Sequence, residues 1–204
     1  MELRDKNGLT EKEFLAAYKE KDYKKPSLTA DIAVFSGTSA KREILLIRRG
    51  GHPCLGHWAL PGGFANDDES IEQTAARELA EETHLQNLPM EEIGLFSQPH
   101  RDPRTWVVSD AFAALIPEEQ KQLAHADDDA ADSAWFIISL NETEKDHFKI
   151  RFSSEKDDFE VELLKKMKPG VTSPQAFFEI VKNGGLAFDH ALIIARALNR
   201  MKLI

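Results

Sequence analysis

The sequence predicts an α/β domain in which a mixed β-sheet is layered with helices. Short apolar or alternating segments, which are typical of strands, come before, between and after segments that carry helix start signals. The chain has 204 residues, of which 42% are hydrophobic and 30% charged. These values are typical of one globular domain and exclude wholesale disorder. We therefore expect residues 1–204 to form a single domain.

The N-terminal residues 1–26 should form a short helix and a linker. Thr10 and Glu13 stand three residues apart, the spacing of a capping box in which each side chain bonds the backbone N–H of the other. A helix over residues 10–20 is therefore expected before the first strand.

The central part of the chain should supply most of the sheet. Residues 43–49 (EILLIRR) are mostly apolar, which predicts a strand with both faces covered and thus a central position. A short helix is expected over residues 117–123. The other expected strands cover residues 28–35, 92–98, 105–115 and 134–138, and a short apolar stretch with a glycine-rich turn covers residues 58–63.

The C-terminal part should add a hairpin and two helices. Residues 141–170 are polar, and alternating apolar residues within 148–163 predict a β-hairpin insertion. The Ser-Pro pair at Ser173 is typical of a helix N-terminus. We therefore expect residues 173–204 to hold two helices, the second of them capped by Asp189.

A second capping box, Ser70 with Gln73, predicts a helix that runs to about Thr83. On this helix Glu78 and Glu82 continue the inward face that begins at Ile71 and Ala75, and Glu81 lies beside them. Acids in a last turn oppose the helix dipole, and a local conflict of this kind is typical of functional sites. The alternative is an acidic helix face in solvent, which is the usual role of glutamate-rich runs.

The overall charge restricts the ligands. The chain carries 35 acids and 26 bases, a net charge of -9, so bulk electrostatics should exclude nucleic acid as a partner. An anionic substrate would need a divalent cation to offset the repulsion. Glu78 and Glu82 can hold one ion, Glu81 can reach a second, and the Gly62 carbonyl can join them because glycine allows close approach of the backbone.

The sequence indicates no membrane segment and no leader. No apolar run approaches the ~20 residues that cross a bilayer, and the N-terminus lacks an apolar signal region. The single cysteine, Cys54, excludes an internal disulfide framework and a cysteine-based zinc site, and we assign it a structural role. A cytoplasmic location is expected.

The acidic helix lies within a longer pattern. The pattern reads Gly63, five residues, Glu69, seven residues, and then Arg77-Glu78-x-x-Glu81-Glu82. It resembles the Nudix box of the Nudix hydrolases. The resemblance implies a Nudix-type α/β/α sandwich and a metal-dependent pyrophosphohydrolase that uses Mg²⁺, with Mn²⁺ as an alternative.

The resemblance also assigns roles. It implies that Glu78, Glu81 and Glu82 are catalytic metal ligands assisted by the Gly62 carbonyl. It further implies that Glu69 and Arg77 pair to brace the loop against the helix. The chain departs from the family at His84, where glycine is usual. This residue follows the helix and is expected in the left-handed conformation, at a cost of roughly 1 kcal/mol.

Segments outside the box resemble the ADP-ribose pyrophosphatase branch of the family and also the Nudix-related regulators of NAD metabolism. They are Ile47 to Gly63, Arg101-Asp102-Pro103-Arg104 with Val107 to Ser109, Asp128 to Phe136, and Leu186-Ala187-Phe188-Asp189-His190. The resemblance implies hydrolysis of ADP-ribose to AMP and ribose 5-phosphate. The alternatives are another substrate (NADH, a nucleotide sugar or a dinucleotide) and a non-catalytic ADP-ribose sensor. We expect no winged helix after Ile204, and a homodimer only by resemblance.

Four arginines could bind the substrate. Arg101 and Arg104 lie in an expected loop, where they either clamp a diphosphate or form a solvated turn. Arg48 and Arg49 end a strand, and because side chains alternate along a strand only one of them should face the phosphates.

Acids and aromatic residues give further candidates. Asp128 or Asp129 could act as a catalytic general base, or both could lie in a solvated loop. Trp58 and Trp135 could stack on adenine, or they could pack in the core.

Overall fold

The computed structural model describes residues 2–19, 22–38, 40–124 and 132–204. Within these ranges the helices are α1 (Glu11–Ala17), α2 (Ile71–Thr83) and α3 (His190–Arg200), and a 3-10 helix spans Glu118–Leu123. The strands are β1 (Ser27–Gly37), β2 (Arg42–Arg48), β3 (Trp58–Ala59), β4 (Gly62–Phe64), β5 (Met90–Phe96), β6 (Val107–Ile116), β7 (Asp132–Glu144), β8 (His147–Ser153), β9 (Asp158–Lys168) and β10 (Gln175–Lys182). In the described part of the chain, no helix is long and apolar enough to cross a membrane.

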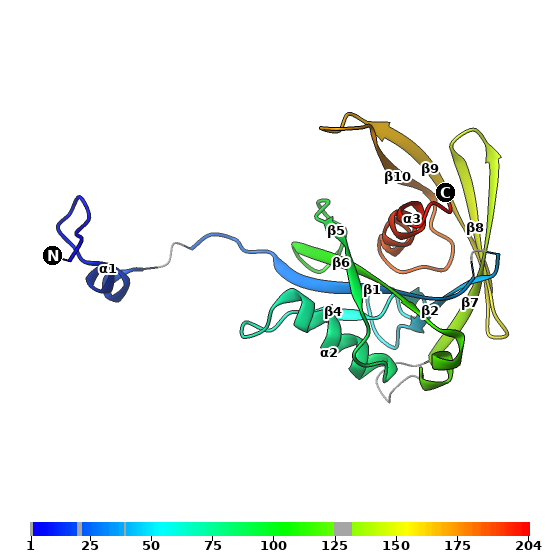
Figure 1. Cartoon of the computed structure of the whole chain (residues 1–204), viewed down its shortest axis with the longest axis horizontal. Helices are drawn as coiled ribbons and strands as arrows, with labels where there is room; N and C mark the ends of the chain where they lie inside the picture. Colours follow the sequence, from blue (N-terminus) through cyan, green and yellow to red (C-terminus); the bar gives the residue numbers. More distant parts are fainter. Residues whose placement is uncertain (1, 20–21, 39, 125–131) are drawn as a thin grey trace.

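The strands form one curled mixed sheet (Figure 1). Its order is β10-β9-β8-β7-β2-β1-β6-β5, with β3 paired to β2 and β4 paired to β1. β1 and β6 run parallel, whereas the neighbouring pairs β1–β2, β2–β7 and β5–β6 are antiparallel. β2 lies well inside this order, which confirms the central position predicted from its apolar sequence.

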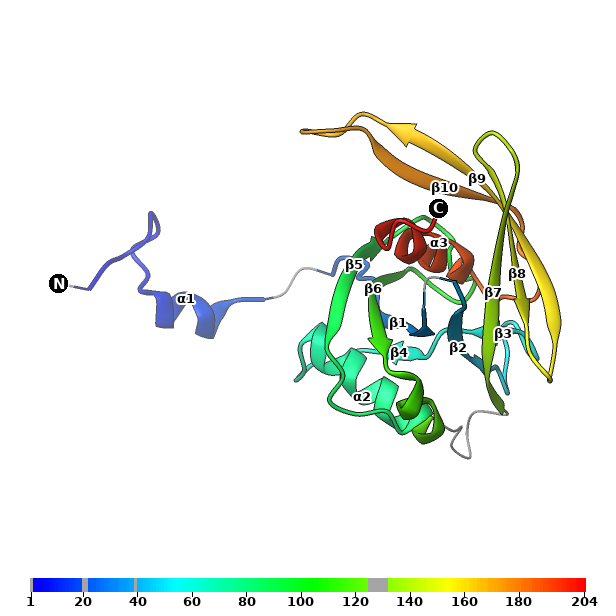
Figure 2. The ribbon, with the colours of Figure 1, turned by 45° about the vertical axis from the view of Figure 1, so that its right-hand side comes forward.

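The sheet is covered on both faces by helices. Along β1 the side chains alternate, so Ile32 packs in one cluster with Leu79 of α2, while Phe35 packs in another with Ile194 of α3. Figure 2 shows α2 and α3 on opposite sides of β1 and β2. The predicted α/β/α sandwich with a mixed sheet is confirmed, and it explains why β1 is buried along almost its whole length.

The N-terminal helix is confirmed as a short element. Thr10 and Glu13 form the expected capping box. No residue of α1 is buried, and the helix stands apart from the sheet in both views (Figures 1 and 2).

The predicted hairpin is present as β8 and β9, which pair in antiparallel register with Ile150 opposite Val161. The strand that precedes it is longer than expected. β7 continues to Glu144 because its second half pairs with β8.

The helix expected after Ser173 is wrong: residues 175–182 form β10, antiparallel to β9. The side chains of Phe178 and Ile180, two residues apart, join the core that α3 covers. This period-2 pattern and the pairing with β9 outweigh the capping signal. Pro174 precedes the strand, where a missing N–H costs no hydrogen bond within the ladder.

Candidate functional site

A small cavity lies where β1, β4, the loop 97–106 and the start of α3 meet. Its volume is about 180 Å³. Polar and charged groups converge on it from distant parts of the sequence. The lining includes Asp31, Arg49, Gly62, Arg101, Arg104 and His190.

Two glutamates of α2 contact the glycine turn beside this cavity. Glu82 accepts a hydrogen bond of 2.8 Å from the backbone N–H of Gly62. A Cβ at Gly63 would lie 2.4 Å from the carboxylate of Glu78, so only glycine lets β4 approach this side chain so closely. The inward face of α2 is centred on Ala75 and Leu79, and Glu78 and Glu82 lie half-buried at its edge.

Burial changes the protonation of Glu82. The pKa of this carboxyl is raised to about 7, mainly by burial and also by the nearby charges of Glu78 and Asp31, although the Gly62 N–H and Arg49 act in the opposite direction. Repulsion among these carboxylates adds to the unfavourable position of the acids in the last turn of α2. A cation at this place would relieve it.

Arg77 organises the outer side of the same turn. Its guanidinium binds both oxygens of Glu69, at 3.0 and 2.6 Å, and also the carbonyl of Phe64 at 3.0 Å. The hydrogen bonds from Arg77 and from the Asn66 N–H lower the pKa of Glu69 to about 2. The pair therefore ties the loop that follows β4 to the middle of α2.

The same guanidinium reaches the remaining acids of the helix. Its Nη1 donates to Glu78 at 2.7 Å and to the exposed Glu81 at 3.1 Å. Within the described ranges, no three Asp, Glu, His or Cys side chains are arranged as a preformed cation site. The donors nevertheless fit a hard divalent cation, because they are carboxylates gathered beside a close-approach backbone turn.

Arg101 is held by acids from two other elements. Its guanidinium makes two hydrogen bonds to Asp189, at 3.0 and 2.6 Å, and lies 3.5 Å from Asp31. Its side chain is only 5% exposed. Asp189 occupies the N-cap position of α3, but its carboxylate makes no capping hydrogen bond because Arg101 takes it. Asp189 therefore does not cap the helix through its side chain, as the sequence predicts, but forms an ion pair with Arg101.

His190, the first residue of α3, binds the segment that connects β3 to β4. Its Nδ1 accepts the backbone N–H of Leu60 at 2.9 Å, two residues before Gly62. Burial lowers the pKa of this imidazole and favours its neutral form, against the nearby charges of Asp31 and Asp189. With Nδ1 as the acceptor, Nε2 carries the proton and points toward Asp31 at 3.6 Å.

Of the two consecutive arginines at the end of β2, only one faces the cavity, as the alternation of side chains along a strand predicts. Arg49 lines the cavity, with its guanidinium 4.9 Å from the ring centre of Phe188. Arg48 is not among the residues that line the cavity and lies over Trp58. Arg104 also lines the cavity, and it is bound by Asp102 at 2.7 Å.

The remaining predicted residues lie elsewhere. Trp58 is 1% exposed, packs edge-on against Phe136 and donates its indole N–H to Asp157. No face of its ring is open to an adenine, so the packing alternative describes it. Trp135 is packed against the core on the α2 side. Asp128 and Asp129 lie outside the described residues.

Asp31, Phe188 and His190 line the cavity although the sequence alone predicts no role for them, and it predicts only a helix cap for Asp189. One signal is present in the sequence, because Asp31 is the only charged residue of the strand β1. The C-terminal stretch that holds the other three was noted without a role. Their convergence depends on the packing of α3 against β1 and on the hydrogen bond from the N–H of Ala187 to the carbonyl of Trp58 in β3.

The positive φ of 60° at His84 fits the position expected after α2. This residue is the C-cap of the helix in the left-handed region, and its N–H bonds the carbonyl of Ala80.

Comparison with known proteins agrees with this geometry. Residues 26–155 match the NUDIX domain. An ADP-ribose pyrophosphatase of Methanocaldococcus jannaschii is 38% identical over 136 residues, which are 65% of this chain and 78% of the relative. An ADPR responsive transcriptional repressor, NtrR, of Acinetobacter baylyi is 37% identical over 125 residues, or 59% of this chain. The matched part spans only 50% of that repressor's length.

Solved structures give the same picture. A MutT/nudix family protein from Enterococcus faecalis superposes with a TM-score of 0.74 at 33% identity, covering 95% of this chain and 70% of that protein. The NUDIX domain of Shewanella oneidensis NrtR, crystallised with ADP ribose, gives a TM-score of 0.63 at 28% identity, covering 95% of this chain and 99% of that domain.

Proposed function

We propose, on the premise that the chain belongs to the NUDIX domain family, that it is a metal-dependent pyrophosphohydrolase that cleaves ADP-ribose to AMP and ribose 5-phosphate. The observation that carries the proposal is the placement of Glu78 and Glu82 against the Gly62–Gly63 turn, beside a cavity lined by arginines. The name of the Methanocaldococcus relative supports the choice of substrate.

Glu78, Glu81, Glu82 and the carbonyl of Gly62 would hold Mg²⁺, or Mn²⁺ in its place. When bound, such ions polarise phosphoryl oxygens and lower the pKa of a bound water. Arg77 holds Glu78 and Glu81 in this structure, so it would keep them oriented while the loop stays tied through Glu69.

The arginines of the cavity would bind the diphosphate. Arg49 and Arg104 line the cavity and carry planar guanidinium groups that can donate to a phosphate. Asp102 binds Nε and Nη2 of Arg104, but this side chain is 42% exposed and its Nη1 makes no hydrogen bond with Asp102. Arg101 also lines the cavity, but its guanidinium is bound by Asp189. We therefore propose that Arg101 shapes the cavity and adds positive charge to it without binding the phosphate directly. Asp128 or Asp129 would act as the general base that takes a proton from the attacking water.

A sensor of ADP-ribose is the second candidate, because the Acinetobacter relative is named as an ADPR-responsive repressor and the Shewanella domain was crystallised with ADP ribose. The two candidates differ in whether the bound molecule is cleaved. The three glutamates at the turn favour the enzyme, because a sensor needs no hydrolytic metal site.

A substrate panel separates the candidates. With Mg²⁺ present, the protein is incubated with ADP-ribose, NADH, ADP-glucose, a diadenosine polyphosphate and an oxidised nucleoside triphosphate, and the products are separated by chromatography. We expect AMP and ribose 5-phosphate from ADP-ribose as the most efficient reaction. Tight binding of ADP-ribose without turnover of any compound would support the sensor instead.

We further propose that residues 1–204 form one domain, and that the protein is a cytoplasmic homodimer that binds neither nucleic acid nor membrane. The net charge of -9 supports the lack of affinity for nucleic acid. Light scattering on a sizing column measures the mass of the assembly, and the mass of one chain would refute the dimer.

A further inference from the structure

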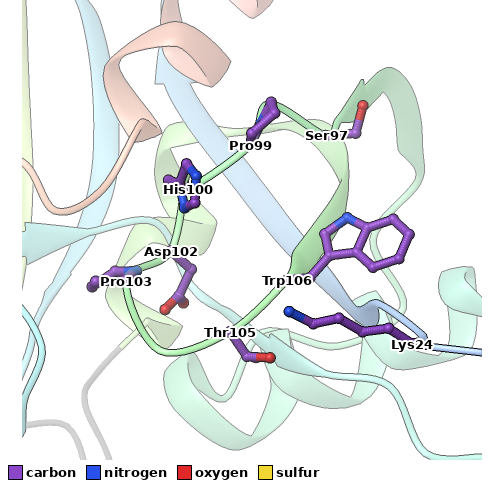
Figure 3. Close-up of a pocket in the computed structure, with 8 residues that line it drawn as sticks. All are labelled: Lys24, Ser97, Pro99, His100, Asp102, Pro103, Thr105 and Trp106. Carbon is purple, nitrogen blue, oxygen red and sulfur yellow. The ribbon is translucent and has the colours of Figure 1, made fainter.

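Residues of the loop 97–106 line two hollows. One is the cavity beside Gly62, and the other is a larger pocket of about 540 Å³. Asp102 lines both of them. The larger pocket is lined by Lys24, Ser97, Pro99, His100, Asp102, Pro103, Thr105 and Trp106 (Figure 3).

Trp106 gives this pocket its character. Trp106 is 43% exposed, although a residue with so large an apolar side chain is usually more deeply buried. Its indole is drawn beside the side chain of Lys24, while His100 and Asp102 lie along the other part of the loop (Figure 3). An exposed indole next to prolines and a single cation offers a flat apolar face with a polar edge.

The loop holds these groups in place. The carbonyl of Trp106 accepts the N–H of Ser27 at 2.9 Å, which joins the end of the loop to the start of β1. Asp102 is buried, and it accepts both the backbone N–H and the guanidinium of Arg104. His100 has a φ of 63°, a conformation that is costly for a residue with a side chain and is found where the surroundings impose it.

We infer that the larger pocket binds the nucleobase of the substrate, with the base stacked on the indole of Trp106. The inference rests on the proposed function, because it takes the diphosphate to lie in the cavity beside Gly62. A nucleoside diphosphate has an anionic centre and an aromatic end, and the two hollows that meet at Asp102 match these parts in polarity. Lys24 and Thr105 supply a donor cation and a hydroxyl for the edge of the base.

Kinetics with two substrates test the inference. One substrate is ADP-ribose, and the other is a diphosphate that joins two ribose 5-phosphate units and has no base. In Trp106→Ala we expect KM for ADP-ribose to rise by about tenfold or more, with kcat changed by no more than about twofold. KM for the base-free compound should stay unchanged, and Trp106→Phe should recover most of the affinity. Equal changes for both substrates, or no change for either, would overturn the inference.

A binding measurement keeps the inference testable when no turnover is found. The chain has three tryptophans, and Trp58 is buried. Titration with ADP-ribose should quench the fluorescence of the wild type and of Trp135→Phe, because the half-buried Trp135 packs against the core on the α2 side and does not line the larger pocket. The quenching should disappear in Trp106→Phe.

The two measurements fail independently. Quenching that depends on Trp106 without turnover would refute the hydrolase and keep the base pocket. Turnover with quenching that persists in Trp106→Phe would keep the hydrolase and refute the base pocket. Circular dichroism melting of each variant shows whether a lost signal comes from unfolding.

Discussion

Arg101 and Asp189 are 88 residues apart in the chain and are joined by two hydrogen bonds of 3.0 and 2.6 Å. The pair connects the loop after β5 to the N-cap of α3, beside the cavity that Arg101 lines. Both side chains are almost buried, at 5% and 12% exposure. The shape of the cavity therefore depends on an ion pair that neither segment can form alone.

Asp189→Asn should destabilise the protein by about 3 kcal/mol, because it removes the charge that makes two short hydrogen bonds with the buried Arg101 and leaves this guanidinium with Asp31 alone, at 3.5 Å. The matched control is Asp158→Asn, which breaks the ion pair between Asp158 and Arg151. Their side chains are 47% and 60% exposed, respectively. This change should cost less than about 1 kcal/mol. Urea denaturation measures both values, and equal effects would contradict the role given to the buried pair.

Gly63→Ala tests the contact between β4 and Glu78. The added Cβ would lie 2.4 Å from a carboxylate at the end of a flexible side chain, so the carboxylate must move while the backbone stays. We expect hydrolysis of ADP-ribose to fall by about tenfold or more, with little change in melting temperature. Gly51→Ala is the control, because a Cβ there meets nothing within 4 Å. A normal rate in Gly63→Ala would mean that Glu78 has no fixed role.

Arg49 and Arg48 form a natural pair of test sites. Arg49 lines the cavity beside Phe188, whereas Arg48 lies over Trp58. A charged hydrogen bond to phosphate contributes about 1.5–3 kcal/mol, so Arg49→Ala should raise KM for ADP-ribose by about tenfold or more. Arg48→Ala should change it by less than about threefold. The reverse order in steady-state kinetics would show that the diphosphate binds elsewhere.

His190 should make the protein less stable in acid. Burial lowers its pKa in the folded state, helped by Arg101 and Arg49 and opposed by Asp31 and Asp189. Below the ordinary value of about 6.5 the unfolded chain gains a proton that the folded protein does not bind, so stability falls as the pH falls.

The size of this effect follows from linkage. Stability should fall by up to about 1.4 kcal/mol per pH unit below about pH 6.5. Denaturation midpoints at several pH values compare the wild type with His190→Gln, which keeps an acceptor for the Leu60 N–H but does not titrate. Parallel curves for the two proteins would refute the assignment.

Local signals in the sequence predicted most of the fold. The capping boxes at Thr10 and Ser70, the apolar strand β2 and the hairpin β8–β9 all rest on interactions between near neighbours. Residues 175–182 were misread, because a Ser-Pro helix signal coincides with an alternating strand pattern and pairing with β9 decides between them. Such a choice depends on tertiary contacts.

The site was predicted only in part. The glutamates and Gly62 lie within about 20 residues of one another, so their spacing alone suggested that they act together. Asp31, Arg101 and Asp189 meet across 70 and 88 residues. Nothing in their own surroundings in the sequence indicates that contact, and only the packing of α3 on the sheet creates it.

The rate of ADP-ribose hydrolysis by Glu82→Gln with saturating Mg²⁺ tests the central claim most directly. Gln keeps an oxygen that can accept the Gly62 N–H, so the fold should be preserved while the charge is lost. We predict that the wild type releases AMP and ribose 5-phosphate in equal amounts and that kcat of the variant falls by about a hundredfold or more. Undiminished turnover by a folded Glu82→Gln protein would contradict the account.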